Sequence, residues 1–241
     1  MAVDVIMKIR LDKFLADMGF GTRSQVRQQI AGGNVTVNGL PARRPELKVD
    51  TDKDRVLFCG TEAAYAQYEY YMLNKPAGVV SATEDKKERT VLDLLQERKR
   101  KDLFPVGRLD KDTEGLLLIT NNGDLAHRLL APGRHVDKVY YVEVDGILDQ
   151  QDVEAVSQGI VLRDGYQCLP GKLELLEGNT SAYITIREGK YHQIKRMMAA
   201  RGKPISYLKR IRFGPLQLDP QLDKGGWRAL TQEELQELFR Q

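Results

Sequence analysis

From residue 70 onward the chain is dominated by short apolar runs bounded by Gly, Pro, Asn or Asp. These runs include YYMLN, GVVSA, GLLLIT, VYYVEV, AYITI and PISYL. Short runs that are rich in β-branched and aromatic residues predict β-strands. Predicted helices separate them irregularly, at TVLDLLQERKR, GDLAHRLL (with Asp124 as its cap), LDQQDVEAVSQG, YHQIKRMMAARG and TQEELQELFRQ. We therefore predict an α+β domain with a mixed, largely antiparallel sheet flanked by helices.

The first part of the chain predicts a separate small module of two helices and a hairpin. Apolar residues in IRLDKFLADM fall near one helical face, and glycines end that helix. Thr22 or Ser24 can cap a second helix that runs to about Ala31. The segment NVTVNGLPA then predicts two short strands around an Asn-Gly turn. We expect an N-terminal extension at 1–7, the small module at 8–59, a linker at 60–68 and the main domain at 69–241.

The composition excludes several classes of protein. With 41% hydrophobic and 29% charged residues, the chain can bury a core and is not expected to be disordered. No apolar run approaches the ~20 residues that span a bilayer, and the N-terminus lacks the features of a signal peptide. Cys59 and Cys168 lie far apart and form no C-x-x-C spacing, so a zinc site is not indicated. These features predict a cytoplasmic protein.

Positive charge gathers in two stretches of a chain whose net charge is only +3. Residues 8–49 hold eight Lys and Arg against three Asp and Glu, and residues 188–212 hold eight against one. Two separated basic surfaces favour contact with a polyanion such as RNA. The alternative is that each stretch is an ordinary solvated face.

Residues 105–124, PVGRLDKDTEGLLLITNNGD, carry acidic side chains at alternate positions and resemble the start of a calcium loop. An EF-hand needs Glu at the twelfth position, but counting from Asp110 that position is Asn121. The run GLLLIT that intervenes predicts a strand, so the calcium interpretation fails. Within this segment Asp112 and Glu114 are interpreted as loop structure. The residues alone leave open whether the loop is a structural turn or the seat of other chemistry.

Several segments, in order, resemble the RNA pseudouridine synthases, in the branch typified by the small-subunit ribosomal RNA enzyme RsuA. They are YYMLNKPAGVVSA, GRLDKDTEGLLLITNNGDLAHRL, KVYYV, EGKYHQIKRM and YLKRIRFG. The N-terminal IRLDKFLADMGFGTRSQVRQQIAGGNVTVNG resembles an S4 RNA-binding module. The resemblance covers almost the whole chain. It implies an S4-like module joined to a catalytic domain that isomerises uridine in RNA, a reaction that requires neither a metal nor a redox cofactor.

The resemblance also implies roles for individual residues. Asp110 matches the essential carboxylate, which acts on the sugar as nucleophile or as base. Lys195 matches its basic partner, although it could instead belong to the basic face. Tyr140 matches the tyrosine that stacks on uracil, and Tyr141 points to the opposite strand face. Arg108 matches an arginine that enters the place of the flipped base, and a phosphate contact is the alternative.

Further residues are expected to contact RNA or to support the fold. We interpret Lys75 as an architectural or phosphate-facing residue beside the pocket. The candidates for RNA contacts are Arg108, Lys75, Arg10, Lys13, Arg23, Arg27, Arg43, Arg44, Arg196 and Arg210. The histidines have no ligand spacing, and we interpret them as structural or RNA-facing; they are His127, His135 and His192.

The leading hypothesis is therefore an isomerase that converts a uridine of ribosomal RNA to pseudouridine. In the family that the chain resembles, some large-subunit members lack the S4 module and others carry a long basic C-terminal tail. The resemblance therefore favours 16S over 23S ribosomal RNA, because this sequence has the module and ends at LQELFRQ without such a tail. The alternatives are the same chemistry on 23S ribosomal RNA, or a catalytically silent S4-type protein that binds RNA on the ribosome. The expected partner is ribosomal RNA, either free or in an assembling small subunit, and the resemblance suggests a monomer.

Overall fold

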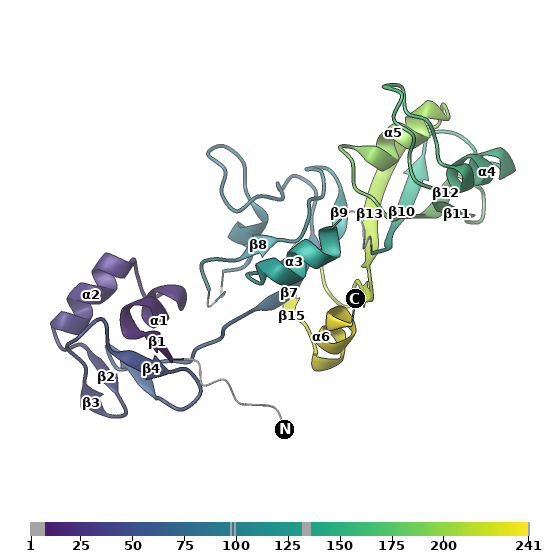
Figure 1. Ribbon diagram of the computed structural model, residues 1–241. Helices are drawn as coiled ribbons and strands as arrows, with labels where there is room; N and C mark the ends of the chain where they lie inside the picture. Colours follow the sequence, from purple (N-terminus) through teal and green to yellow (C-terminus); the bar gives the residue numbers. More distant parts are fainter. Residues whose placement is uncertain (1–7, 97, 99, 132–135, 241) are drawn as a thin grey trace. The chain divides into compact units, whose positions relative to one another are not determined.

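The computed structural model describes residues 8–96, 98, 100–131 and 136–240 (Figure 1). The predicted extension at 1–7 and His135 lie outside the described residues. The chain divides into two compact units. The N-terminal unit comprises residues up to Glu69 together with the segment Glu97–Leu103, and the second unit comprises Tyr70–Gln96 and the chain from Phe104. Among the described residues, no helix is long and apolar enough to cross a membrane.

The N-terminal unit contains two helices and small antiparallel sheets. Strand β1 pairs with β4, and a second sheet has the order β3-β2-β5-β6. Of the two predicted caps, Thr22 and Ser24, it is Thr22 that caps helix α2, and it forms a capping box with Gln25. Phe14, Leu15 and Val26 are at most 1% exposed and lie in the core of the unit. The elements are β1 Lys8–Arg10, α1 Leu11–Asp17, α2 Arg23–Ala31, β2 Val35–Val37, β3 Leu40–Pro41, β4 Lys48–Asp50, β5 Val56–Phe58 and β6 Thr61–Ala63.

The predicted linker at 60–68 is partly wrong. Residues Thr61–Ala63 form strand β6, which pairs antiparallel with β5 through Val56 and Ala63. Ala63 is buried with the core of the N-terminal unit. The small and polar residues of this segment suggested a linker because their strand is short and carries little apolar surface of its own.

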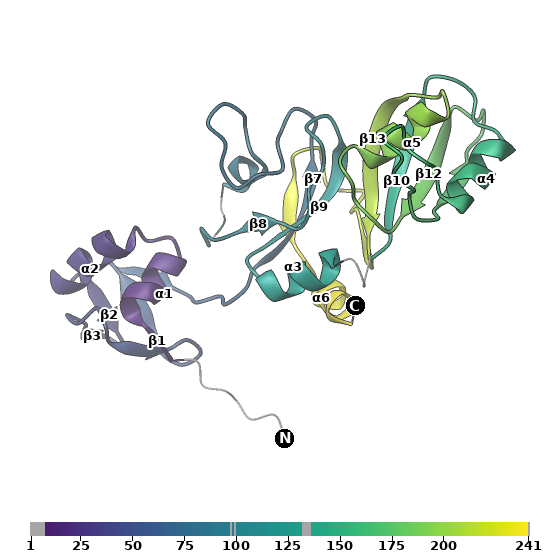
Figure 2. The same ribbon diagram turned by 45° about the horizontal axis from the view of Figure 1, so that its top comes forward.

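The second unit is built on one twisted sheet, as predicted for an α+β domain (Figures 1 and 2). Its strand order is β11-β12-β10-β13-β9-β7-β15, and β14 and β8 pair with β13 and β9. Strands β13 and β9 are parallel and the other paired strands are antiparallel. The strands are β7 Tyr70–Lys75, β8 Phe104–Pro105, β9 Glu114–Thr120, β10 Lys138–Val144, β11 Lys172–Leu175, β12 Ser181–Ile186, β13 Ile205–Phe213, β14 Leu216–Gln217 and β15 Trp227–Ala229.

Helices cover this sheet in two groups. Helices α4 and α5 lie beside β10, β12 and β13 in both views (Figures 1 and 2). Leu125 and Leu129 of α3 and Leu238 of α6 share a core with Leu116 and Leu118 of β9. The helices are the short 3₁₀ helix η1 Val91–Leu94, α3 Gly123–Leu130, α4 Gln150–Gln158, α5 Gln193–Ala200 and α6 Gln232–Phe239.

Three local predictions in this unit are wrong. The predicted helix at 90–100 is only η1, because Arg100 is instead held in the N-terminal unit, where its main-chain N–H donates to Glu69 and its side chain to the Ala66 oxygen. The segment GVVSA makes only an isolated bridge between Val80 and Thr90. Asn122, not Asp124, caps α3, because its side chain accepts from the main-chain N–H of Leu125.

Candidate active site

Asp110 lies in the loop between β8 and β9, and the segment that follows β7 holds this loop. Ser81 Oγ donates to the main-chain oxygen of Leu109 at 2.9 Å and accepts from its N–H at 3.1 Å. The N–H of Gly78 donates to the oxygen of Lys111 at 2.8 Å. The motif NKPAGVVSA thus supplies partners for the backbone of the acidic loop.

Lys75 ends β7 directly beneath the same loop and is fully buried. Its Nζ donates to the main-chain oxygens of Pro76, Asp110, Lys111 and Thr113 at 2.8 to 3.2 Å. A buried ammonium whose donors are all used by carbonyl groups cannot reach a phosphate. The assignment of Lys75 to RNA binding is therefore wrong, and its architectural role is the correct alternative.

The carboxylate of Asp110 is about a quarter exposed and faces helix α5. Lys195 Nζ, on the first turn of α5, lies 3.3 Å from Asp110 Oδ2 and 2.5 Å from Asp112 Oδ1. The family resemblance implied that Lys195 is the partner of Asp110, and the structure places the two groups within 3.3 Å of each other. Asp112, interpreted as loop structure, also takes part, and the hydrogen bond from Lys195 lowers the pKa of the Asp112 carboxyl.

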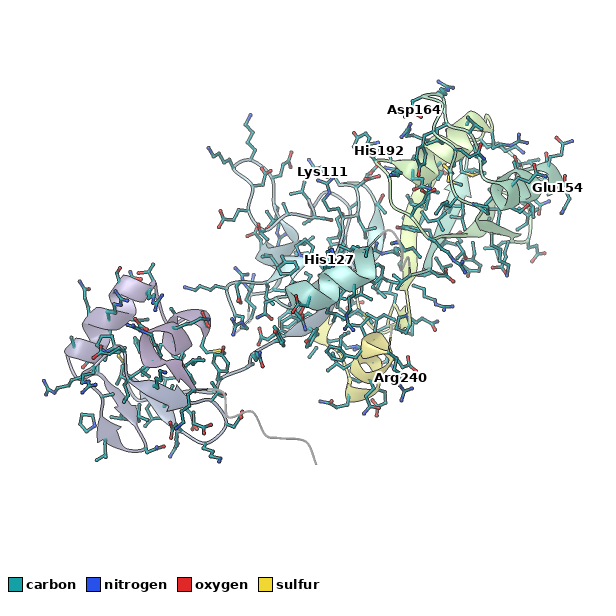
Figure 3. All side chains as sticks on the ribbon, in the orientation of Figure 1. Lys111, His127, Glu154, Asp164, His192 and Arg240 are labelled. Carbon is teal, nitrogen blue, oxygen red and sulfur yellow. The ribbon has the colours of Figure 1, made fainter. Side chains whose placement is uncertain are left out.

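His192, which is labelled in Figure 3, approaches the other oxygen of the same carboxylate. Its Nε2 lies 3.6 Å from Asp110 Oδ1, and its ring stacks on Tyr191 with centroids 3.9 Å apart. His192 has a left-handed backbone with φ of 48°, at the position before α5 begins. The interpretation of His192 as structural or RNA-facing did not include this approach to Asp110. The signal that could have indicated it is the position of His192 three residues before Lys195.

The loop before α5 is fixed by a buried polar cluster around Glu188. This carboxylate accepts from the Tyr166 hydroxyl, the Leu169 N–H and the Gln193 side chain at 2.6 to 2.8 Å. The hydrogen bond to Glu188 raises the pKa of Tyr166 to about 12. Gln193 also accepts from the N–H of Lys190 at 2.9 Å. These bonds define the positions of His192 and Lys195 relative to the sheet.

Tyr140 completes the wall of the pocket from strand β10. It is 7% exposed and lines the same pocket as Arg108, Asp110 and Lys195. About 420 Å³ of empty space lies in and over this pocket, and part of it is open solvent. Tyr141 points to the opposite face of the sheet, where its ring contacts Tyr183 and Tyr207. The alternation predicted for the two tyrosines is thus present.

Glu114 does not belong to this pocket. It accepts from Tyr207 Oη at 2.6 Å and pairs with Lys224 at 2.8 Å. Burial alone would raise the pKa of the Glu114 carboxyl, but the hydrogen bonds from Lys224 and Tyr207 outweigh it and lower the pKa. Glu114 is therefore structural, as expected, and ties the β9–β13 region to the segment before β15.

Arginines of the N-terminal unit gather around one buried carboxylate. Asp12 is fully buried and accepts from Arg10 at 3.0 Å, from Arg23 at 3.3 Å and from Arg27 at 2.8 Å. The arginine side chains are about half exposed, so each has surface that faces solvent. Asp12 was not singled out from the sequence.

The other predicted RNA contacts are dispersed. Lys13 pairs with Asp17 at 2.8 Å, and Arg44 with Glu46 at 3.3 Å. Arg43 is exposed. Arg196 pairs with Asp164, which is labelled in Figure 3. Arg210 is 2% exposed and lines a second pocket that also contains Arg108, Asp110 and Tyr140. Contact of these residues with RNA stays a prediction.

Comparison with known proteins identifies two family models in this chain. The family model described as RNA pseudouridylate synthase matches residues 69–200, and the S4 domain model matches residues 9–56. An uncharacterized RNA pseudouridine synthase of Bacillus subtilis is 46% identical, over 94% of this chain and 97% of its own. A ribosomal small subunit pseudouridine synthase A of Pseudomonas aeruginosa is 43% identical, over 94% of this chain and 99% of its own.

A solved structure shares the fold. The crystal structure of a pseudouridylate synthase superposes with a TM-score of 0.68 and 35% identity, over 95% of this chain and 99% of its own. The family match spans more than half of the chain and includes Asp110, Tyr140 and Lys195. The chain therefore belongs to the RNA pseudouridylate synthase family and carries an N-terminal S4 domain.

Proposed function

We propose that the protein converts a specific uridine of 16S ribosomal RNA to pseudouridine, acting as a monomer. The substrate is supported by relatives named ribosomal small subunit pseudouridine synthase A, which are 38% to 43% identical in Pseudomonas aeruginosa and Vibrio vulnificus. The S4 domain supports RNA binding independently of the catalytic unit. Family membership alone does not identify the RNA substrate. The Bacillus subtilis relative, for example, is named only as an uncharacterized RNA pseudouridine synthase.

The observation that carries the proposal is the arrangement around the Asp110 carboxylate. Lys195 faces one of its oxygens, His192 faces the other, and Tyr140 lines the pocket beside them. A pocket that excludes water raises the energy of an ionised carboxylate, and a nearby ammonium restores it. Lys195 would therefore offset the negative charge of Asp110 while this carboxylate acts on the ribose.

The reaction moves the base without gain or loss of atoms. The bond between ribose C1′ and uracil N1 breaks, uracil turns in the pocket, and a bond from C1′ to C5 forms. The C5 proton leaves and N1 acquires a proton. Asp110 acts at the ribose as nucleophile or as base. The face of Tyr140 would support uracil outside its RNA stack, and Arg108 would occupy the vacated place or bind a phosphate.

The RNA would be held chiefly by positive charge. The cluster of Arg10, Arg23 and Arg27 around Asp12 offers exposed guanidinium groups on one part of the S4 domain. Each phosphate contact that is lost should reduce the slope of log affinity against log salt by about 0.7–0.9. The S4 domain would bind folded RNA while the larger unit performs the isomerisation.

The test is pseudouridine mapping by carbodiimide labelling and reverse-transcription stops. Ribosomal RNA is taken from cells that lack the protein and from cells complemented with wild type or with Asp110→Ala. We expect one stop to disappear from 16S and to return with wild type alone, while Asp110→Ala keeps its affinity for the RNA. A stop lost from 23S would overturn the 16S assignment. No change in any ribosomal RNA would contradict the proposed reaction on ribosomal RNA.

A further inference from the structure

A second pocket adjoins the catalytic pocket and contains two buried cations. It encloses about 920 Å³ of space open to solvent and shares Arg108, Asp110 and Tyr140 with the first pocket. Lys138 and Arg210 line it and are 7% and 2% exposed. The proposed reaction gives Lys138 no role, and for Arg210 the sequence predicts only an RNA contact whose partner atom is not specified.

The sheet register places both cations on the face of the sheet that carries Tyr140. Lys138 is opposite Phe213, and Tyr140 is opposite Arg210, in the antiparallel pair of β10 and β13. Side chains alternate along a strand, so 138 and 140 share a face. Arg210 and Phe213 are three residues apart, so strand alternation alone would place them on opposite faces of the sheet. The register shift between Val139 and Tyr140 allows both residues to line the same pocket.

Neither cation forms an ion pair with a carboxylate within the described part of the chain. Lys138 Nζ donates only to the main-chain oxygens of Val136 and Arg187, at 3.3 and 3.2 Å. Arg210 Nε donates to the Leu116 oxygen at 2.7 Å, and its Nη2 is buried with no partner among the described residues. Both cations lie over the ring of Phe213, at 5.9 and 5.0 Å from its centroid.

This arrangement is costly for the protein alone. Burial and the charge of Arg210 together lower the pKa of Lys138 to about 8, although the charges of Asp137 and Glu188 act in the opposite direction. Buried charges in proteins are normally paired or bind an ion of opposite sign. Two buried cations that open onto a substrate pocket therefore indicate that an anion arrives with the substrate.

We propose that Lys138 and Arg210 form a subsite for a backbone phosphate of the RNA, next to the uridine that Tyr140 and Asp110 receive. A phosphodiester offers charged oxygens that both cations can bind. The subsite rests on the proposed function, because it assumes an RNA strand entering the catalytic pocket. It would fix the strand on one side of the uridine and so help to hold the flipped nucleotide in register.

The test combines a variant of the protein with a change in the RNA. A ribosomal RNA that the wild type modifies is rebuilt by ligation with a single uncharged methylphosphonate linkage, either 5′ or 3′ of the modified uridine. The variant is Lys138→Met, and Lys138→Arg tests rescue. Lys209→Met is the matched control, because Lys209 precedes Arg210 on β13 and points to the opposite face.

With charged RNA, we expect Lys138→Met to raise KM about tenfold and Lys138→Arg and Lys209→Met to change it little. With wild type, one of the two methylphosphonates should raise KM by a similar factor. That methylphosphonate should have no further effect on Lys138→Met, since both changes remove the same contact. Lys138→Met should change the melting temperature little, because the removal of a buried unneutralised charge offsets the loss of the two hydrogen bonds to the Val136 and Arg187 oxygens.

Other results would overturn the subsite. If both linkages leave the wild-type KM unchanged while pseudouridine still forms, the enzyme stands and the subsite is wrong. If inorganic phosphate raises the melting temperature of wild type but not of Lys138→Met, and neither linkage matters, the cations bind free phosphate and not the RNA. If no ribosomal RNA is modified by wild type, the proposed function fails and the subsite with it.

Discussion

Lys75 Nζ donates a hydrogen bond to the main-chain oxygen of Asp110 at 3.0 Å, so a side chain without solvent exposure fixes the residue proposed to act on the ribose. The same ammonium binds the oxygens of Lys111 and Thr113, which follow in the loop. The position of the carboxylate therefore depends on a charge that never meets the substrate.

Replacing Lys75 by Met should damage both stability and turnover. The substitution keeps the apolar stem but leaves buried carbonyl oxygens without their donor, at a cost of about 3 kcal/mol or more. The acidic loop should loosen, so kcat should fall more than RNA affinity. Urea unfolding and single-turnover kinetics measure the two effects. A stable, fully active variant would show that the loop does not need this lysine.

Buried lysines should also make stability depend on pH. Burial lowers the pKa of Lys75 and of Lys138 to about 8, whereas an unfolded lysine titrates near 10.5. Between these values the unfolded chain binds more protons, so the free energy of unfolding should rise with pH across that window. Comparison at pH 7.5 and 9.5 should show a smaller rise for Lys138→Met than for wild type. Equal rises would contradict the buried charge at Lys138.

Asp112 competes with Asp110 for Lys195. Lys195 Nζ lies 2.5 Å from Asp112 and 3.3 Å from Asp110, yet Asp112 is 74% exposed. Asp112→Asn should release Lys195 toward Asp110 and change kcat by less than about threefold, a small change in free energy. Lys195→Met should reduce kcat about a hundredfold or more, since Asp110 then loses its ammonium. If Asp112→Asn were as inactive as Asp110→Ala, the assignment of the acting carboxylate would be wrong.

Features that depend only on neighbouring residues could be predicted from the sequence. The capping box of Thr22 and Gln25 is readable because the partners lie three residues apart. The opposite faces of Tyr140 and Tyr141 follow from strand alternation alone. The pairing of Asp110 with Lys195 came from family resemblance, since 85 residues separate them and no spacing rule connects them.

Long-range partners explain what the sequence did not predict. Among the described residues of 90–100, only Val91–Leu94 are helical, and Arg100 bonds instead to residues of the N-terminal unit. The burial of Lys75 depends on carbonyl groups more than 30 residues away. The approach of His192 to Asp110 depends on a left-handed backbone held by bonds around Glu188. No local pattern encodes any of these contacts.

The arginine cluster of the S4 domain should depend on Asp12. Asp12→Asn removes a buried charge bonded to Arg10, Arg23 and Arg27, and should destabilise the N-terminal unit by about 2 kcal/mol or more. The variant should also bind RNA more weakly, because the guanidinium groups lose their common anchor. Glu46→Gln is the control, since its pair with Arg44 is exposed and should be worth less than about 1 kcal/mol. Thermal unfolding measures the stability of both variants, and filter binding measures their affinity for RNA. Equal losses of stability and affinity in the two variants would contradict the role of Asp12.

Gly115 of β9 pairs with Arg210 of β13, and Arg210 lines the second pocket. A Cβ atom at this position would lie 2.2 Å from the main-chain oxygen of Arg210, and the backbone φ is +99°. Gly115→Ala must therefore separate the two strands and should cost more than about 3 kcal/mol, with loss of activity. Gly178→Ala is the matched control, because its φ is +80° but no atom lies within 4 Å of the added Cβ. That control should cost only about 1 kcal/mol, the conformational part alone. Calorimetry of the full chain measures both variants, and a similar loss in each would show that close approach to Arg210 does not determine the need for glycine.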